Sequence, residues 1–371
     1  MRIGIDCRMA GTGEGIGRYV EELIKHLSEI DNENIYVLLF SESMLASKFQ
    51  ISNDKFQKII VKSKYYSLSE QTYFIWELFK LKLDIVHFPS FNVPILYPGK
   101  FVVTIHDIIH HRFPGRKKSR FVHRLAYRLV IWAAIKRAKR IIAVSEATKR
   151  DILKVFHVGL EKITVIYEGA GLKLASINDT DAVLKRYNIQ KPFLLFVGVW
   201  RQYKNLPRLA AAFDLVRDKY SLDCELVLAG KIDDFYPEIK NEILSIKNAD
   251  YIRALGYVPE PDLAALYRAA RIFVIPSLTE GFGLVGIEAQ SSGTAVLASD
   301  IAVLREVLGS GALYFNPRNV EDMAEKISTL WQNEASLEDS RRAGRDNAAR
   351  FTWTKTAEGT KMIYNSIAWD F

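Results

Sequence analysis

The run Arg271-Ile-Phe-Val-Ile-Pro276-Ser277, followed at once by Leu278-Thr279 and Glu280-Gly-Phe-Gly-Leu-Val-Gly-Ile-Glu288, decides how the chain folds. Its first part is apolar, β-branched and ended by a proline, which is typical of a buried strand. Its second part passes through glycines into a helical pattern. We therefore expect Glu280 on a loop at the carboxyl end of a strand. Glu288 is expected about a turn and a half into the following helix.

The segment between the two glutamates has the composition of a phosphate site. Its glycines place backbone N–H groups at a helix N-terminus, where an anion can bind, and the flanking carboxylates can hold sugar hydroxyls. The segment Gly281, Phe282, Gly283 and Leu284 thus predicts a sugar-nucleotide site. Two glutamates spaced by eight also arise by chance, and it is the surrounding strand, proline and glycines that favour the site.

Length and composition indicate an ordinary globular protein of two domains. The chain has 371 residues, 49% of them hydrophobic and 25% charged, which exceeds one typical core. No apolar run reaches transmembrane length, and the N-terminus enters a strand pattern without a signal peptide. Cys7 and Cys224 are expected to be buried thiols in a reducing cytoplasm.

The positive charge of +8 is unevenly distributed. Eleven Lys or Arg and no Asp or Glu lie between Ile108 and Ser145. The basic stretch from Arg116 to Arg140 is interleaved with aromatic residues, which suits an anionic membrane surface. A solvated helix face is the simpler alternative, and no nucleic-acid recognition motif accompanies the stretch.

Strand and helix patterns alternate twice along the chain, which predicts two doubly wound parallel sheets. In the first half the strands are expected at Arg2–Asp6, Ile35–Phe40, Lys58–Val61, Asp84–Phe88, Phe101–Ile105, Arg140–Val144 and Ile163–Ile166, with helices such as Tyr19–Ile30 and Glu146–Phe156. The segment Tyr167–Gln190 is interpreted as the connection between domains. In the second half the strands are expected at Phe193–Val197, Glu225–Leu228, Tyr251–Ala254, Ile272–Ile275, Ala295–Ala298 and Ala312–Tyr314, and the helices at Leu206–Lys219, Pro261–Ala270, Val285–Ser291 and Val320–Asn333.

Two features of the first half are candidate functional elements. The loop ending Gly15-Ile16-Gly17 follows a strand and does not fit G-x-G-x-x-G, so it is interpreted as a mobile loop whose N–H groups can approach a diphosphate or an acceptor. A plain flexible turn is the alternative. His106 ends a buried strand and is expected to face a cleft between the domains.

The second half adds a cationic loop and a turn. After Gly198 the chain carries Arg201 and Lys204 at a helix start, where they can neutralise a diphosphate without a metal ion. A solvent-exposed basic loop is the alternative. The turn at Tyr257 and Val258 can hold a nucleobase through backbone groups. No cluster with metal-ligand spacing is present in the sequence.

Taken together, these motifs resemble glycosyltransferase family 4, whose members are retaining enzymes of the GT-B fold. The resemblance rests on the following segments: Gly15-Ile16-Gly17-Arg18-Tyr19, Asp84-Ile-Val-His-Phe-Pro-Ser90, Thr104-Ile-His-Asp107, Val144-Ser-Glu146, Gly198 with Lys204-Asn205, and Glu280–Glu288. It implies two Rossmann-like domains facing a cleft, residues 1–170 for the acceptor and 171–350 for the nucleotide sugar. The segment 351–371 would be a helix that returns to the first domain.

The resemblance also implies roles. Glu280 and the amides of Gly281–Leu284 would bind the transferred sugar, and Glu288 the ribose. Arg201 and Lys204 would hold the diphosphate, with His106 near the sugar. No protein nucleophile and no cofactor are expected, and the acceptor hydroxyl would attack on the face that the diphosphate leaves.

This chain departs from the family pattern at two places. Arg201 lies three residues before Lys204, whereas many members place the arginine beside the lysine or five residues before it. Lys204 is therefore the safer assignment. Tyr167-Glu168-Gly169 stands where members often have Pro-Asn-Gly, and we draw no functional conclusion from that difference.

The motif set is most similar to bacterial O-antigen and capsule mannosyltransferases. We therefore expect a metal-independent hexosyltransferase using GDP-mannose and a lipid-linked glycan, peripheral on the cytoplasmic face of the plasma membrane. A UDP-sugar or another nucleotide sugar is the alternative donor. An epimerase, a phosphorylase or a non-catalytic membrane- or nucleic-acid-binding protein are the alternative functions. A phosphorylase would need a lysine placed for pyridoxal phosphate, and no such motif is present.

Overall fold

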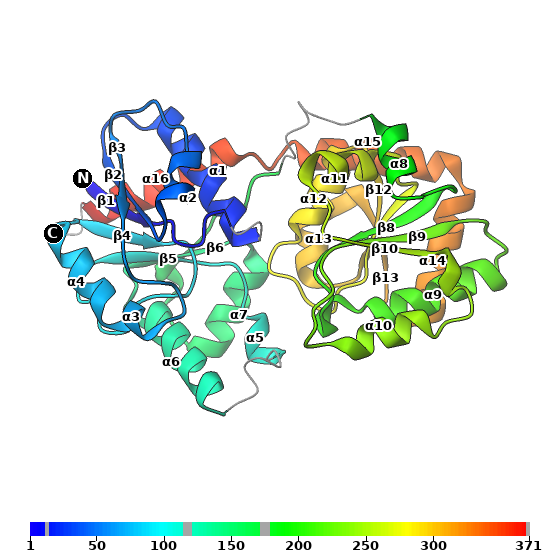
Figure 1. Ribbon diagram of the computed structural model, residues 1–371, viewed down its shortest axis with the longest axis horizontal. Coiled ribbons are helices and arrows are strands. Elements are labelled where there is room, and N and C mark those ends of the chain that lie inside the picture. Colours follow the sequence, from blue (N-terminus) through cyan, green and yellow to red (C-terminus); the bar gives the residue numbers. More distant parts are fainter. Residues whose placement is uncertain (12–14, 114–120, 171–178, 369–371) are drawn as a thin grey trace. The chain divides into compact units, whose positions relative to one another are not determined.

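The computed structural model describes residues 1–11, 15–113, 121–170 and 179–368. The chain divides into two compact units, one made of Met1–Gly169 with Thr352–Phe371 and one made of Ala170–Phe351. Each unit is built on a parallel sheet with helices on both of its faces (Figure 1). This α/β architecture confirms the predicted fold class.

The sheet of the first unit has the strand order β3-β2-β1-β4-β5-β6-β7. Its strands are β1 Arg2–Asp6, β2 Ile35–Phe40, β3 Phe56–Ile60, β4 Ile85–Phe88, β5 Phe101–Ile105, β6 Arg140–Ala143 and β7 Ile163–Val165. Its helices are α1 Gly15–Ile30, α2 Ser43–Lys48, α3 Leu68–Gln71, α4 Tyr73–Lys80, α5 Ile109–Arg112, α6 Phe121–Arg137, α7 Glu146–Phe156 and α16 Trp353–Ala368, with the 3₁₀ turn η2 Leu160–Lys162.

Each face of this sheet buries its own apolar cluster. On one face, Tyr19 of α1 and Tyr364 of α16 pack with strand residues such as Ile5. On the other face, Phe74 of α4 and Ile131 of α6 pack with the strand residues whose side chains point to that face. Because successive strand side chains alternate between faces, continuous apolar strands are the expected sequence for a sheet covered on both sides.

The last helix belongs to the first unit, although the second unit precedes it in the chain. The hydroxyl of Thr356 in α16 donates to the carbonyl of Tyr167 at 2.8 Å. A Cβ on Gly169 would lie 2.3 Å from the backbone nitrogen of Trp353, so only glycine allows this close approach.

The sheet of the second unit has the order β10-β9-β8-β11-β12-β13. Its strands are β8 Phe193–Val197, β9 Glu225–Ala229, β10 Ile252–Gly256, β11 Ile272–Ile275, β12 Ala295–Ser299 and β13 Ala312–Phe315. Its helices are α8 Thr180–Arg186, α9 Leu206–Asp218, α10 Pro237–Leu244, α11 Glu260–Ala269, α12 Leu284–Ser291, α13 Ala302–Leu308, α14 Val320–Gln332 and α15 Glu334–Ala348, with 3₁₀ turns η4 Gln202–Lys204, η5 Ala249–Tyr251 and η6 Gly309–Gly311.

Both sheets share one topology. In each, the chain starts in the middle, moves outward on one side, and then returns to continue on the other side. The reversal lies between β1 and β4 in the first unit and between β8 and β11 in the second. Ligands of doubly wound sheets bind outside the carboxyl ends of the strands at such a reversal, so these two places are where site residues should gather.

Many sequence-based boundaries were wrong, most of them by one residue, and three of the differences have a clear physical reason. Strand β3 begins at Phe56 rather than Lys58, because the Phe56 ring stacks on Tyr36 at 4.4 Å and brings the strand into the sheet earlier. Helix α1 begins at Gly15 rather than Tyr19, because its packed apolar face extends back to Ile16 and outweighs the low helix propensity of glycine. The predicted irregular connection Tyr167–Gln190 contains helix α8, whose Val183 is fully buried.

Both cysteines are free and buried, as expected. Within the described ranges, the structure has no helix with the length and apolar character needed to cross a membrane.

Candidate functional site

The predicted phosphate-binding residues lie at the reversal between β8 and β11. Gly198 follows β8, and the loop carrying Glu280 follows β11. The backbone of Tyr203 accepts a hydrogen bond from the N–H of Leu278 at 2.8 Å, which ties the two loops together. Residues that are about eighty positions apart in sequence therefore form one continuous edge.

Two glycines allow the strand ends to meet at this edge. Gly198 has φ +151° and Gly230, after β9, has φ +145°. A Cβ on Gly230 would lie 2.0 Å from the carbonyl oxygen of Gly198. A side chain at Gly230 would push the two loops apart, so the close backbone approach requires glycine.

Lys204 and Glu280 form a direct ion pair. Nζ of Lys204 lies 2.7 Å from Oε1 of Glu280, and the two side chains are only 14% and 10% exposed. Such a short, largely desolvated, charge-assisted contact is stronger than a surface ion pair. Sequence reasoning placed both residues in the site, but it did not predict that the Glu280 carboxylate pairs directly with the Lys204 ammonium group.

Asn205 holds this loop in place and was not among the predicted site residues. It adopts a left-handed conformation with φ +59° and is 2% exposed. Its Nδ2 donates to the carbonyls of Pro276 at 2.9 Å and Pro317 at 2.8 Å. An asparagine immediately before a Leu-Pro helix start is the signal that could have suggested this anchor.

Arg201 lies on the same loop but has a different partner. Its Nε lies 3.4 Å from the carboxylate of Asp233, and about a third of its side chain is exposed. The structure therefore places the two cations on one loop, each facing its own carboxylate.

Glu288 is buried inside helix α12. It is 3% exposed, and the hydroxyl of Tyr267 donates to its Oε2 at 3.2 Å. Gly283, with φ +88°, precedes the helix, and a Cβ there would lie 2.7 Å from Leu304. The glycine thus lets the helix begin close to α13, while Leu284 starts the helix.

The remaining predicted donor residues occupy less central positions. Phe282 is buried with its ring 5.6 Å from that of Phe351, which indicates a packing contribution. Tyr257 is 68% exposed and Val258 is buried, both directly after β10 at the outer edge of the sheet. The carbonyl of Gly256 accepts from the N–H of Gly230 at 2.7 Å, so this turn is joined to the β9 loop.

In the first unit, His106 follows β5 and is held by two acceptors. Its Nδ1 lies 2.7 Å from Oε1 of Glu168, and its Nε2 lies 2.8 Å from the carbonyl oxygen of Pro89. Burial alone would lower the pKa of His106, but the hydrogen bond and charge of Glu168 outweigh burial and raise it. Sequence reasoning attached no role to Glu168.

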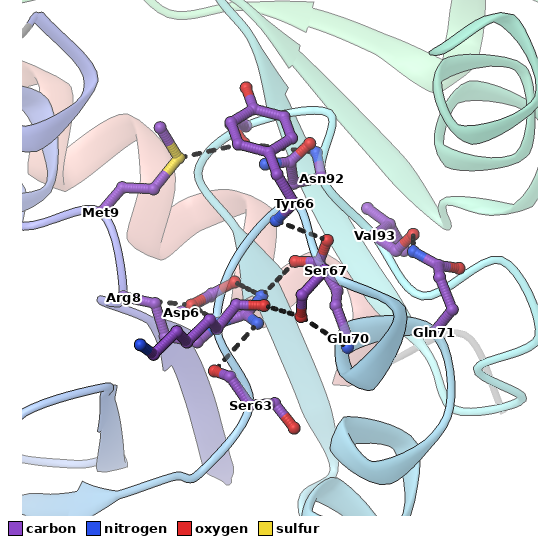
Figure 2. A network of polar contacts seen from close by, with 12 residues as sticks. Asp6, Arg8, Met9, Ser63, Tyr66, Ser67, Glu70, Gln71, Asn92 and Val93 are labelled. Atoms are coloured by element: carbon purple, nitrogen blue, oxygen red, sulfur yellow. Dashed lines mark hydrogen bonds and ion pairs between the residues drawn. The ribbon is translucent and has the colours of Figure 1, made fainter. Parts of the chain in front are cut away.

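A second feature missed by sequence reasoning is a buried ionic network beside β1 (Figure 2). The guanidinium of Arg8 contacts Asp6 at 2.7 Å and Glu70 at 2.6 Å, and all three are buried. Arg8 also lies 3.8 Å over the ring of Phe74. Because Asp6 and Glu70 come from segments far apart in sequence, the network fixes the loop after β1 against helix α3.

Two glycines that were predicted to lie in a loop belong to helix α1 instead. Gly15 and Gly17 lie in the first turn of α1 and not in a loop, and residues 12–14 fall outside the described residues. Gly17 is buried, whereas a Cβ on Gly15 would meet nothing within 4 Å. Of these two glycines, Gly15 is exposed and Gly17 is not.

Two family models match this chain. Residues 13–173 match the model described as Glycosyltransferase Family 4, and residues 180–349 match the model described as Glycosyl transferases group 1. The chain belongs to the GT-B glycosyltransferases. The two matched segments cover both Rossmann-like units of this glycosyltransferase.

Individual relatives agree with this family. The glycosyltransferase is 31% identical to O-antigen chain mannosyltransferase RfbU of Salmonella typhimurium, over 61% of this chain and 62% of that protein. It is 26% identical to O-antigen chain mannosyltransferase B of Escherichia coli, over 95% and 96%. The match thus spans less than two thirds of RfbU and nearly all of mannosyltransferase B.

A solved structure shows the same fold. HepE from Anabaena, in complex with UDP-glucose, superposes with a TM-score of 0.77 at 15% identity, covering 99% of this chain and 100% of that one. Among the residues described here, no group of three or more His, Cys, Asp or Glu side chains is placed to hold a metal ion.

Proposed function

We propose that this glycosyltransferase is a retaining enzyme that moves a hexose from a nucleotide sugar to a hydroxyl of a lipid-linked glycan in cell-surface polysaccharide synthesis. The observation that carries the proposal is the Lys204–Glu280 pair at the β8/β11 reversal, beside the N-terminus of α12. A cation suits a diphosphate and a carboxylate suits sugar hydroxyls. The pair therefore offers both groups that a nucleotide sugar requires.

Catalysis in this proposal needs no protein nucleophile. Lys204 and Arg201 stabilise the negative charge that grows on the departing diphosphate, and Glu280 orients the sugar. Glu288, already bonded to Tyr267, binds the ribose. The acceptor hydroxyl attacks on the face from which the diphosphate leaves and transfers its proton to the leaving phosphate oxygen.

The donor we favour is GDP-mannose. Support comes from the names of RfbU and mannosyltransferase B, both O-antigen chain mannosyltransferases. UDP-glucose or another UDP sugar is the second candidate, and the UDP-glucose complex of the fold neighbour HepE favours it. The same two names support the O-antigen part of lipopolysaccharide as the proposed product.

A panel of nucleotide sugars tests this function. The enzyme is incubated with GDP-mannose, UDP-glucose and UDP-galactose and a lipid-linked glycan acceptor, in excess chelator, and products are read by mass spectrometry. We expect transfer of mannose, with the α configuration of the donor preserved in the NMR spectrum of the product. An inverted anomer would refute retention, and loss of activity in chelator would refute metal independence.

We also propose that the first unit binds the anionic inner face of the plasma membrane. On α6, the exposed apolar residues Leu125, Leu129 and Trp132 recur at i, i+4 and i+7 and form one stripe, next to Arg124 and Arg128. The cluster Arg116–Arg120 of the predicted basic stretch lies outside the described residues.

Helix α4 supports the same surface and was not singled out by its sequence. It covers the same face of the sheet as α6. Its Trp76 and Phe79 are 49% and 56% exposed, and Lys80 lies 3.3 Å over the Trp76 ring. Aromatic side chains with basic neighbours are typical of membrane interfaces. Co-sedimentation with anionic liposomes that weakens with salt is expected, and a preference for nucleic acid over liposomes would favour a non-catalytic binding protein instead.

A further inference from the structure

The ring of His106 is bonded to two groups that can only accept hydrogen bonds. Nε2 faces the carbonyl oxygen of Pro89 at 2.8 Å, and Nδ1 faces the carboxylate of Glu168 at 2.7 Å. A carbonyl and a carboxylate have no proton to donate, and a neutral imidazole has only one N–H. Both bonds form together only when the ring carries a proton on each nitrogen.

The neighbouring His87 has the opposite environment and serves as an internal contrast. Its Nδ1 lies 2.6 Å from the hydroxyl of Tyr364, and its Nε2 lies 2.8 Å from the hydroxyl of Thr104. Hydroxyls can donate or accept, so a neutral ring satisfies both contacts. Burial, together with the charge of His106, lowers the pKa of His87 to about 3.

The other titratable groups near His106 leave this arrangement intact. Asp107, next in sequence, adds negative charge that raises the pKa of His106. The ring of Tyr19 meets that of His106 edge-on at 4.9 Å, and burial raises the pKa of its hydroxyl, so Tyr19 stays neutral. His87 stays neutral as well. Glu168, 7% exposed, is thus the charged partner in contact with the ring.

We propose that Glu168 is a positioning residue that holds His106 as an imidazolium and thereby places a fixed positive charge at the carboxyl end of β5. The consequence for catalysis rests on the proposed function. Both ring N–H groups are already bonded, so His106 acts on a bound ligand through the position and charge of its ring, and Glu168 fixes both.

The protonation state of the His106 ring can be measured without an activity assay. Histidine is labelled with ¹⁵N, His106 is assigned from its absence in His106→Gln, and its ring nitrogens are followed between about pH 5 and pH 10. In the wild type, we expect both nitrogens to stay protonated above the ordinary histidine pKa of about 6.5. A neutral ring at pH 7, with the proton on Glu168 instead, would overturn the proposal.

The Glu168→Gln variant tests the cause. The pKa of His106 should fall by about two units, since an opposite charge in contact typically shifts a pKa by one to three. The matched control is Glu22→Gln, because Glu22 lies 3.8 Å from His26 within helix α1, in another partly buried histidine–carboxylate pair. This control should leave the pKa of His106 unchanged. An unchanged His106 titration in folded Glu168→Gln would also overturn the proposal.

The catalytic consequence is read from pH profiles of kcat/KM. The alkaline limb should move to lower pH in Glu168→Gln by the shift seen in the NMR titration, with the optimum rate largely kept. A uniform loss at every pH would mean that Glu168 has only a structural role. If the wild type transfers no sugar, the proposed function fails, while the NMR result on Glu168 and His106 stands or falls separately.

Discussion

Replacing Glu280 by Gln separates two roles that the Lys204–Glu280 pair combines. Nζ of Lys204 and Oε1 of Glu280 are 2.7 Å apart and largely buried. A diphosphate that binds Lys204 must therefore compete with the carboxylate for the ammonium group. Glu280→Gln removes the competing charge and keeps the side-chain volume. We expect GDP, which carries no sugar, to bind this variant more tightly than the wild type.

The expected size of the effect follows from the contact. A hydrogen bond to a charged group contributes about 1.5–3 kcal/mol net. Because an ammonium has three N–H donors and can serve two ligands in part, we expect the lower end, about 1.5 kcal/mol, or roughly a tenfold lower Kd for GDP. Lys204→Met should weaken GDP binding by about tenfold or more.

Turnover should change in the other direction. Glu280 is proposed to bind the transferred sugar, so Glu280→Gln should lower kcat/KM for GDP-mannose by roughly a hundredfold, the loss of one charged hydrogen bond of about 2.7 kcal/mol. Tighter GDP binding combined with slower transfer is a result that general unfolding cannot produce.

Calorimetric titration of GDP into the wild type and both variants measures the effect. Asp223→Asn is the matched control, because Lys191 and Asp223 form an ion pair at 2.5 Å beside the amino ends of β8 and β9, away from the site. It should leave the Kd unchanged. If Glu280→Gln and Lys204→Met weaken GDP binding equally, the competition between carboxylate and diphosphate does not exist.

Three further predictions address stability and the membrane surface. Asn205→Ala removes two buried hydrogen bonds to carbonyls and should cost about 3 kcal/mol, measured as a lower unfolding temperature; an unchanged temperature would contradict the anchoring role. Acid should destabilise the first unit through His87, whose pKa is lowered to about 3. The unfolded chain binds the extra proton, so stability falls as pH drops from about 6.5 towards 3, and His87→Gln should flatten this dependence in thermal melts. Replacing Trp76 and Trp132 by Ser should reduce co-sedimentation with anionic liposomes severalfold, because each removes exposed aromatic surface, while GDP binding stays unchanged; full retention of liposome binding would refute the proposed surface.

The strands and the loops that follow them were predictable because their signals are local. Continuous apolar runs gave β1, β2, β5, β8 and β11 with their observed bounds. Parallel sheets then require that the residues after β8 and β11 share an edge.

The polar partners were not predictable from local patterns. Glu168 contacts His106 from 62 residues away, and Asn205 bonds to Pro317 from 112 residues away. Arg8 is an ordinary charged residue in the sequence, but in the structure it is buried and paired with Glu70 of helix α3. Such contacts depend on how distant segments pack, and neither periodicity nor composition contains that information.

Hydrogen–deuterium exchange with and without GDP-mannose tests the central claim most directly. The account places the nucleotide-sugar site on the loops at the β8/β11 reversal. Backbone amides in residues 198–205 and 278–288 should therefore exchange more slowly when GDP-mannose is bound, and Lys204→Met should abolish this protection. Protection confined to other segments, or the same protection in Lys204→Met, would contradict the assignment.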